Sequence, residues 1–303
     1  MTMRIRGYHR ENGTIGIRNH LLALPSVVCA NDAAVAAAAG IAGAVHIEHP
    51  VGCAQIGVDK DQTWRTLVGV GSHPNVRRSV IVSLGCEGIV AATIEAGIRE
   101  RGRETTVFAI QSTGGVVEAG QAAHAYLAQE AGEDLRDADL EIGDLVLGVA
   151  DIRPLGAAGT AIVEAFRGAG GRVILAVPPG TDPPPGVPLR EYAAAMDGAP
   201  VSSMTTGAGD GETITGLAAA GAHLVLAAGD PGHLGGHAVC PVIRVGYDDA
   251  HRRALADDLD GQIGDLTPTE WVARILAVAG GTLTASEELG AAVFAIQRIG
   301  PTL

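Results

Sequence analysis

The chain has 303 residues, a length that allows two domains with a core in each. Apolar residues make up 47% of it but aromatic residues only 3%, so the cores must consist mainly of Ala, Val, Leu, Ile and Gly in closely packed layers. The formal net charge of −13 opposes binding to nucleic acids and to anionic membrane surfaces, because both attract clusters of Lys and Arg. We therefore expect small molecules or other proteins as partners.

The four cysteines lack the close spacing of a disulfide framework, and the first residues, MTMRIRGYHR, lack the apolar region of a signal peptide. Both features indicate the reducing cytoplasm. No apolar run approaches the roughly 18 to 20 residues that span a bilayer, because Gly, Pro or a charged residue interrupts each one. We expect no role in a membrane.

Strand-like apolar runs alternate with helix-like stretches rich in Ala, Glu and Arg through the first half of the chain. The predicted strands lie near 20–29, 44–49, 79–84 and 105–111, and the predicted helices near 31–40, 59–70, 88–102 and 115–131. This alternation is typical of βαβ units that form a parallel sheet covered by helices on both faces. The acidic segment 132–144 interrupts the pattern and marks a candidate domain boundary.

A second βα series follows this boundary. Its predicted strands lie at 144–150, 172–177, 223–229 and 241–246, with a helix near 156–168. The prolines of TDPPPGVP (181–188) suit neither a central strand nor a helix interior, so they predict an exposed loop. We therefore predict two doubly wound, mostly parallel, Rossmann-like α/β halves at residues 1–140 and 141–303.

Residues that suit chemistry follow three predicted strands of the first half. Cys29 ends LLALPSVVC, His49 and Cys53 follow the strand in VHIEHPVGC, and Cys86 and Glu87 follow the strand in VIVSLGCEG. The carboxyl ends of parallel strands share one edge of a sheet, where open α/β sheets bind their ligands. We expect these five residues to converge on one crevice.

His49 and Cys53 suit two chemical roles. Imidazole and thiolate are ligands for iron or another transition metal, and together they also form an acid/base pair. The structural alternative is that Cys53 packs as a small buried residue and His49 as a hydrogen-bonded core residue.

Glu87 is harder to explain by structure alone, because a carboxylate at a buried strand end needs a cation or hydrogen-bond donors beside it. Its neighbour Cys86 has a structural alternative, since cysteine is among the residues most often buried. Cys29 has another, because SVVCAND also reads as a strand end that leads into a helix capped by Asn31 or Asp32.

Five further residues are candidates for substrate binding. Arg18 and Asn19 follow GTIG, and the guanidinium of Arg18 suits either a bidentate clamp on a substrate carboxylate or an interdomain salt bridge. His73 and Asn75 in HPN suit a site or a simple turn. Gln111 lies in IQSTGGVV (110–117), whose glycine-rich backbone could present N–H groups to an anion.

The segment GDPGHLGGH (229–237) carries Asp230, His233 and His237 after a predicted strand. The spacing of the two histidines would match a metal pair on a helix. The glycine content instead favours a substrate loop. The chain contains no GxxxxGK[ST] sequence, which excludes P-loop nucleotide hydrolysis.

Four blocks, taken in this order, resemble one known family: GYHRENGTIGIRNHLLALPSVVCA, HPVGCAQIGVDKDQTWRTLVGVGSHPNV, VIVSLGCEG and IQSTGG. They are similar to the large catalytic part of the altronate/galactarate dehydratase family, which includes the large subunit of sulfolactate sulfo-lyase. The resemblance is close over about residues 6–116 and looser over 204–264. It implies an enzyme that removes water or sulfite from a small hydroxylated carboxylic acid after abstracting the proton α to the carboxylate.

The resemblance also implies a divalent metal, usually iron. The ligands would come from His49, Cys53, Cys86 and Cys29, with Glu87 and His49 in catalysis, and the metal would polarise the leaving hydroxyl or stabilise an enediolate. A single Fe²⁺ and an iron–sulfur cluster both remain open, as does another divalent metal. The family pairs this part with a small domain or subunit, so we expect a separate small subunit as partner, and also a homo-oligomer.

The chain departs from the family after LGVAD (147–151). The family carries Cys-Gly-Gly-Ser-Asp at this point, whereas this chain reads LGVADIRPLGAAGTA. The alternative hypothesis is therefore a noncatalytic or ligand-binding paralogue that keeps the fold and the first-half crevice.

Overall fold

The computed structural model describes residues 5–132, 136–151, 153–207, 209–229, 232 and 234–300. Its first half contains a four-stranded sheet in which all strands run parallel in the order β4–β3–β5–β6. The strands are β3 (His20–Pro25), β4 (Ala44–His46), β5 (Val76–Ser83) and β6 (Glu104–Ala109). The chain builds outward from β3 to β4 and then crosses to β5 on the other side. This reversal between β3 and β5 is the point at which open α/β sheets form a ligand crevice.

Helices cover both faces of this sheet. One face carries α1 (Asn31–Ala38) and α5 (Val116–Ala128), and the other carries α2 (Gly57–Gly71) and α3 (Ala91–Glu100), with the short α4 (Ile110–Thr113) after β6. The contact between α1 and α5 is built from alanines and Gly120, where an added Cβ would lie 3.2 Å from the Cβ of Ala36. Small side chains thus set the close packing that the low aromatic content predicts.

The second half contains a seven-stranded parallel sheet in the order β10–β11–β9–β8–β12–β13–β14. Its strands are β8 (Val146–Val149), β9 (Arg172–Val177), β10 (Leu189–Arg190), β11 (Val201–Thr205), β12 (Leu224–Ala228), β13 (Val242–Gly246) and β14 (Gly261–Gln262). One face packs on α6 (Gly156–Gly168) and α9 (Pro268–Ala279), and the other on α7 (Asp210–Ala219). The prediction of an α/β protein with mostly parallel sheets is confirmed.

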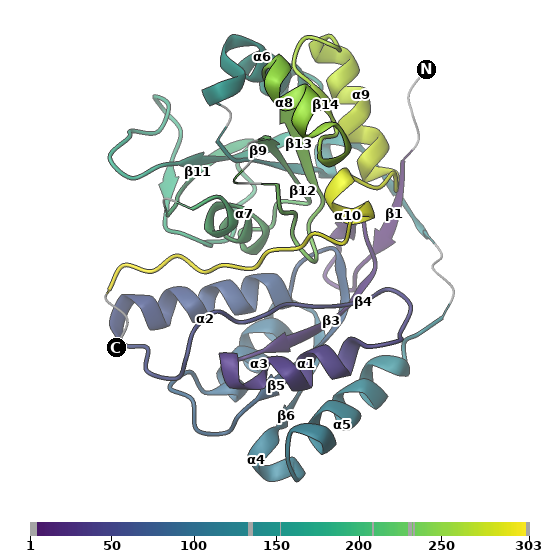
Figure 1. The fold of residues 1–303 in the computed structure, drawn as a ribbon, viewed down its shortest axis with the longest axis vertical. Coiled ribbons are helices and arrows are strands. Elements are labelled where there is room, and N and C mark those ends of the chain that lie inside the picture. The colour runs from purple at the N-terminus through teal and green to yellow at the C-terminus, as the bar shows by residue number, and fades with distance from the viewer. Residues whose placement is uncertain are drawn as a thin grey trace.

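The two halves share a core where α2 packs on α7. A Cβ at Gly69 would lie 2.3 Å from the carbonyl oxygen of Ala219, so only glycine permits this approach. The extended C-terminal segment, yellow in Figure 1, runs between the halves along α2. There the Asp59 carboxylate accepts hydrogen bonds from the N–H groups of Ile299 (2.7 Å) and Gly300 (2.9 Å).

A small antiparallel sheet, β2–β1–β7, also joins distant parts of the chain. It consists of β1 (Ile5–His9), β2 (Ile15–Gly16) and β7 (Ala138–Leu140), and β7 comes from the segment predicted as a boundary. The remaining helices are α8 (Asp249–Ala254) and α10 (Ala285–Glu288), with short 3₁₀ turns at Val28–Ala30, Ile142–Asp144, Arg153–Leu155 and Ala256–Asp258. The proline-rich residues 181–188 form neither helix nor strand and are mostly exposed, as predicted.

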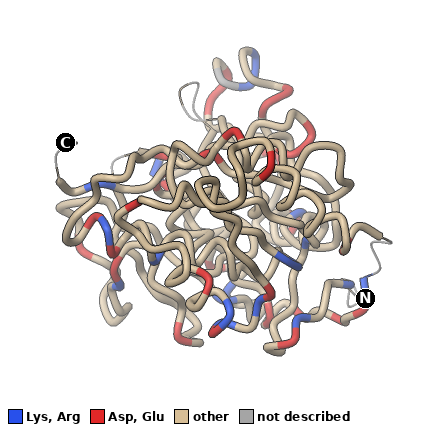
Figure 2. Tube along the Cα trace, turned by 90° about the horizontal axis from the view of Figure 1, so that it is seen from below, with Lys and Arg blue, Asp and Glu red and all other residues tan. Residues whose placement is uncertain are grey.

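Charged residues of both signs are interspersed along the trace in Figure 2, without one continuous basic face in that view. None of the helices in the described part of the chain is long and apolar enough to cross a membrane.

Candidate active site at the carboxyl edge of the first sheet

Polar side chains from four consecutive strand ends meet at the carboxyl edge of the first sheet. Ser26 follows β3, His49 lies three residues beyond β4, and Glu87 follows β5. Gln111 follows β6, and its N–H group donates to the carbonyl of Leu84, which anchors α4 beside the loop of Glu87. The parallel order of the strands carries these residues to the same edge of the sheet.

Glu87 is half-buried, and donors from two directions hold its carboxylate. The Ser26 hydroxyl donates to Oε1 at 2.5 Å, and the backbone N–H of Gly85 donates to Oε2 at 2.7 Å. Burial acts to raise the pKa of Glu87, but the hydrogen bonds from Ser26 and the backbone outweigh it, so the pKa lies below its usual value. Glu87 is therefore ionised at neutral pH and able to accept a proton.

His49 is buried, with 1% of its surface exposed. The Asn31 side chain fixes its backbone, since Oδ1 accepts from the His49 N–H (2.8 Å) and Nδ2 donates to the His49 carbonyl (3.2 Å). The backbone N–H of Val51 donates to Nδ1 of the ring at 3.1 Å. Because Nδ1 accepts this hydrogen bond, the proton of the neutral ring lies on Nε2.

The Nε2 atom of His49 is buried and has no hydrogen-bond partner. Burial lowers the pKa of His49 to about 4, against the nearby charge of Glu87, which raises it. At neutral pH the ring is therefore an uncharged donor. A buried N–H without a partner is costly unless a ligand supplies an acceptor.

The three cysteines predicted for this crevice are exposed, whereas Cys240 is buried and its thiol donates to the carbonyl of Ala222. Cys53 and Cys86 lie on loops that touch, because the N–H of Gly88 donates to the carbonyl of Cys53 at 3.3 Å. Cys29 lies in the 3₁₀ turn that leads from β3 into α1.

The arrangement does not fit a metal bound through His49. A ligating imidazole presents a lone pair to the metal and donates its other N–H, whereas here Nδ1 accepts and Nε2 carries the proton. No group of three or more His, Cys, Asp or Glu side chains within the described ranges is placed to hold a metal ion. A metal held by Cys29, Cys53 and Cys86 without His49 stays a prediction, and no step below depends on it.

The structure does not bring Arg18, Asn19, His73 and Asn75 to this crevice. They precede β3 and β5, so they lie at the amino ends of these strands. His73 accepts from the N–H of Asn75 at Nδ1, and its Nε2 lies 2.8 Å from the carbonyl of Ala222. Both ring nitrogens are thus used within the protein.

Arg18 makes the interdomain ion pair that was the alternative to a substrate clamp. Its Nε and Nη2 donate to the two carboxylate oxygens of Glu287, at 2.8 and 2.9 Å. Its other three N–H groups donate to the carbonyls of Ile17, Val278 and Thr282. All five donors of the guanidinium are occupied, which leaves none for a substrate.

The side-chain amide of Asn75 likewise makes its hydrogen bonds within the protein, and none of the residue's surface is exposed. Its Oδ1 accepts from the N–H of Ile17, and its Nδ2 donates to the carbonyls of His223 and Val239. Asn19 accepts from Arg10 at the same end of the sheet. These contacts join the halves rather than forming a crevice.

A cavity of about 960 Å³ runs along the edge strand β4, between His49 and the C-terminal segment 283–294. The second half contributes His237, whose Nδ1 accepts from the N–H of Val239 (3.3 Å) and whose Nε2 is buried without a partner. Burial, with nearby His20, lowers the pKa of His237 to about 4. Among the described histidines that line this cavity, His49 and His237, one from each half, have a buried Nε2 without a partner.

Ser26 contributes to this region but was not chosen from the sequence. It stands directly after β3, the same position relative to a strand as the residues that were chosen, and this was the signal available. His237 lies in the glycine-rich loop that was selected for a substrate role. Asp230 and His233 of that loop lie outside the described residues.

The fold defines an α/β protein in which two parallel-sheet halves border one cavity. Residues 7–132 match the family model "D-galactarate dehydratase/Altronate hydrolase, second domain", and residues 186–302 match "D-galactarate/Altronate dehydratase, C-terminal". The chain belongs to the D-galactarate/altronate dehydratase family, and the resemblance inferred from the sequence is confirmed.

Curated relatives agree with this assignment. The chain is 40% identical over 108 residues to (2R)-sulfolactate sulfo-lyase subunit beta of Chromohalobacter salexigens, which covers 36% of this chain and 27% of the relative. It is 30% identical over 155 residues to altronate dehydratase of Bacillus subtilis (48% and 31%). It is 32% identical over 124 residues to altronate dehydratase of Escherichia coli K12 (37% and 25%). The matches thus span about a quarter to a third of the relatives' length.

Proposed function

We propose that the chain is part of a lyase that eliminates water, or sulfite, from a small hydroxylated carboxylic acid in the crevice at the carboxyl edge of the first sheet. One observation carries the proposal: an ionised, hydrogen-bonded Glu87 lies near enough to His49 for its charge to raise the pKa of that ring, whose Nε2–H is uncharged and unpartnered. The proposed class of reaction is taken from the relatives, which are named altronate dehydratase and sulfolactate sulfo-lyase.

Elimination needs a base for the proton α to the carboxylate and a donor for the negative charge that develops. Glu87 is the proposed base: its carboxylate takes the α proton, and the electron pair of the broken C–H bond passes to the substrate carboxylate as an enediolate. This pair then forms the new C=C bond as the bond from the β carbon to the leaving group breaks. The leaving group takes that bonding pair with it, as sulfite or as hydroxide that receives the proton held by Glu87 and becomes water. The Nε2–H of His49 is the proposed donor to the developing oxyanion, a role that an uncharged imidazole can fill.

A ligand-binding paralogue without turnover is the second candidate. The observation that favours it is the gap between the two family matches, since neither range includes residues 133–185. The segment after LGVAD, where the sequence departs from the family, lies in this gap.

We further propose that the chain works with a separate small subunit, because a relative carries the name subunit beta. A homo-oligomer, a cytoplasmic location and an iron cofactor stay predictions. Anaerobic purification followed by elemental analysis tests the last of these without reference to activity.

The test of the function is an anaerobic assay with altronate, galactarate and sulfolactate, with the chain alone and with the product of any adjacent small gene. Ferrous iron is present in one series and omitted in another. Formation of the keto acid or of sulfite, seen by NMR or by sulfite trapping, supports the lyase. Inactivity in every combination, together with saturable binding of one of these acids, would support the paralogue instead.

A further inference from the structure

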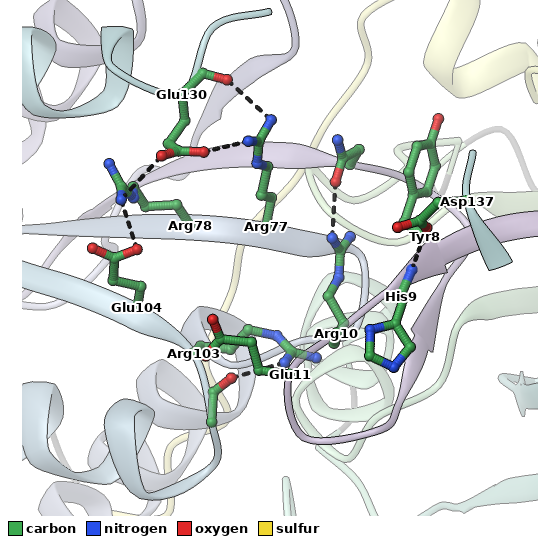
Figure 3. A pocket seen from close by; sticks show the side chains of 12 residues that line it. Tyr8, His9, Arg10, Glu11, Arg77, Arg78, Arg103, Glu104, Glu130 and Asp137 are labelled. Atoms are coloured by element: carbon green, nitrogen blue, oxygen red, sulfur yellow. Dashed lines mark hydrogen bonds and ion pairs between the residues drawn. The ribbon is translucent and has the colours of Figure 1, made fainter. Parts of the chain in front are cut away.

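A second polar cavity lies at the opposite, amino edge of the first sheet. It has a volume of about 450 Å³ and is bounded by the β1 segment, the starts of β5 and β6, the end of α5 and Asp137. Four arginines line it: Arg10, Arg77, Arg78 and Arg103 (Figure 3). The chain as a whole is acidic, so this concentration of guanidinium groups is a local feature.

Two of these arginines are neutralised within the cavity wall. Arg77 pairs with Glu130, and Arg78 lies 3.1 Å from Glu130 and 2.6 Å from Glu104. Figure 3 shows these pairs together on one side of the cavity. Carboxylates already neutralise the charges of Arg77 and Arg78, so these two side chains are poorly suited to pair with an anionic ligand.

Arg10 and Arg103 differ, because every hydrogen-bond acceptor they use is an uncharged oxygen. Arg10 donates to the carbonyls of Pro74 (2.7 Å) and Arg18 (2.8 Å) and to Oδ1 of Asn19 (2.8 Å). Within the described ranges no carboxylate accepts a hydrogen bond from it.

Arg103 donates to Oδ1 of Asn12 (3.2 Å), to Oγ1 of Thr14 (2.8 Å) and to the carbonyl of Gly102. Its Nε is buried and has no partner. Only 6% of Arg10 and 4% of Arg103 is exposed. Two guanidinium groups are thus held in the wall of one cavity by neutral contacts alone.

This arrangement is unfavourable unless an anion completes it. Burying a cation without a counter-charge is costly. Burial lowers the pKa of Arg10 to about 10, Arg103 lowers it further by repulsion, and only Asp137 and Tyr8 act to raise it. Burial likewise lowers the pKa of Arg103 to about 10, with the exposed Glu11 as the one charge that opposes this.

We propose that this cavity binds a small dianion, with carboxylate or phosphate oxygens recognised by Arg10 and Arg103. The planar guanidinium presents paired N–H groups that match either kind of oxyanion. The volume lies within the range of small-molecule sites. The site is separate from the crevice of Glu87, since the two lie at opposite ends of the same strands, and it is independent of the proposed lyase reaction.

The experiment is isothermal titration of the full chain with inorganic phosphate and, separately, with malonate, each against chloride at equal ionic strength. We expect saturable binding of one anion per chain, and the arm that binds more tightly identifies the oxyanion. Arg103→Gln should weaken this binding at least about tenfold, which corresponds to about 1.4 kcal/mol. Arg153→Gln is the matched control, because Arg153 is exposed, pairs with Asp151 and lies outside this cavity, so its affinity should equal that of the wild type.

Arg103 also holds the β1–β2 connection through Asn12 and Thr14, so a second variant removes no buried contact. Glu11→Gln deletes an exposed carboxylate near Arg103 and should tighten anion binding several-fold while the unfolding temperature stays unchanged. Glu87→Gln should bind the anion as the wild type does. Absence of saturable binding by both anions, equal affinity in Arg103→Gln, weaker binding in Glu11→Gln or loss of binding in Glu87→Gln would each overturn the proposal.

Discussion

The two edges of the first sheet use similar residue types for different purposes. At the carboxyl edge, Ser26 donates to the half-buried carboxylate of Glu87, and the Nε2–H of His49 has no partner. At the amino edge, Arg18 and Asn75 direct every side-chain donor to protein acceptors. Unused hydrogen-bonding capacity, rather than residue type, distinguishes the candidate site from the seam.

The direction of the strands explains this difference. Residues that follow parallel strands are carried to the edge where the loops are free to form a crevice. Residues that precede β3 and β5 are carried to the edge where the first half meets the second, and there the seam requires its buried polar groups to be paired. The comparison predicts that substitutions at the carboxyl edge remove function and that substitutions of the fully paired seam residues at the amino edge, such as Arg18 and Asn75, remove stability.

Glu87→Gln is expected to give the largest effect. The change keeps the volume and one acceptor but removes the charge, so turnover should fall by about 10²–10⁴-fold if Glu87 is the base. The unfolding temperature should change little, because the carboxylate is only half-buried. Steady-state kinetics and thermal unfolding measure the two effects.

Glu95→Gln is the matched control for this variant. Glu95 lies on α3 and pairs with Arg99 one turn away, outside the crevice. Its turnover should equal that of the wild type. Wild-type turnover in Glu87→Gln would reject Glu87 as the base.

Arg18→Met tests the other edge. It leaves the half-buried Glu287 beside Thr284 without its cation and removes the buried donors of Arg18, so the free energy of unfolding should fall by about 3–5 kcal/mol. Arg6→Gln removes an exposed arginine from a pair with Asp139 and should cost less than about 1 kcal/mol. Denaturant titration of both variants gives the comparison. Wild-type stability together with a raised KM in Arg18→Met would instead support Arg18 as a substrate-binding residue.

The sequence was sufficient for the class of fold and for one of the two edges. Apolar runs and their alternation with helical stretches predict the parallel sheets, and the position of Glu87 after a strand predicts the crevice. The role of Arg18 could not be decided in this way, because its partner Glu287 lies 269 residues along the chain. The spacing of residues near Arg18 contains no information about α10, which supplies this carboxylate.

The sequence also could not show which ring nitrogen of His49 carries the proton. A histidine after a strand is compatible with a metal ligand, an acid or a donor. The choice depends on whether the N–H of Val51 reaches Nδ1, a matter of loop conformation. Likewise β5 begins at Val76 rather than at residue 79, because Arg77 and Arg78 find carboxylates at the amino edge and so can occupy a strand.

Acid should destabilise the fold through histidines at both edges. Burial lowers the pKa of His49, His223, His237 and His20 to about 4, whereas the unfolded chain titrates near 6.5. Between these values the unfolded state binds more protons, so stability is full above about pH 6.5 and falls as the pH decreases toward 4. Each histidine should contribute about 1.4 kcal/mol per pH unit in this window.

Denaturant titrations at several pH values measure this slope. His223→Gln removes one titrating group at the seam, where His223 accepts from the N–H of Val146. The variant should be less stable at neutral pH and less sensitive to acid. A stability that is constant from pH 7 to pH 5 would contradict the buried, uncharged state of these rings.

Ser26→Ala should give the smallest effect and the most specific one. The Ser26 hydroxyl is one of the donors that hold the pKa of Glu87 down against burial, and the N–H of Gly85 remains after its loss. Loss of a hydrogen bond to the charged carboxylate disfavours its ionised form, so the pKa of Glu87 should rise. If Glu87 must be ionised to act, the acidic limb of the pH dependence of kcat/KM moves to higher pH by the same amount, while the plateau above it changes little.

Ser112→Ala is the matched control, because this exposed hydroxyl donates only to the carbonyl of Ala109. Its pH profile should superimpose on that of the wild type. An unmoved limb in Ser26→Ala, with activity lost evenly at every pH, would show that Ser26 supports the loop rather than the charge of Glu87.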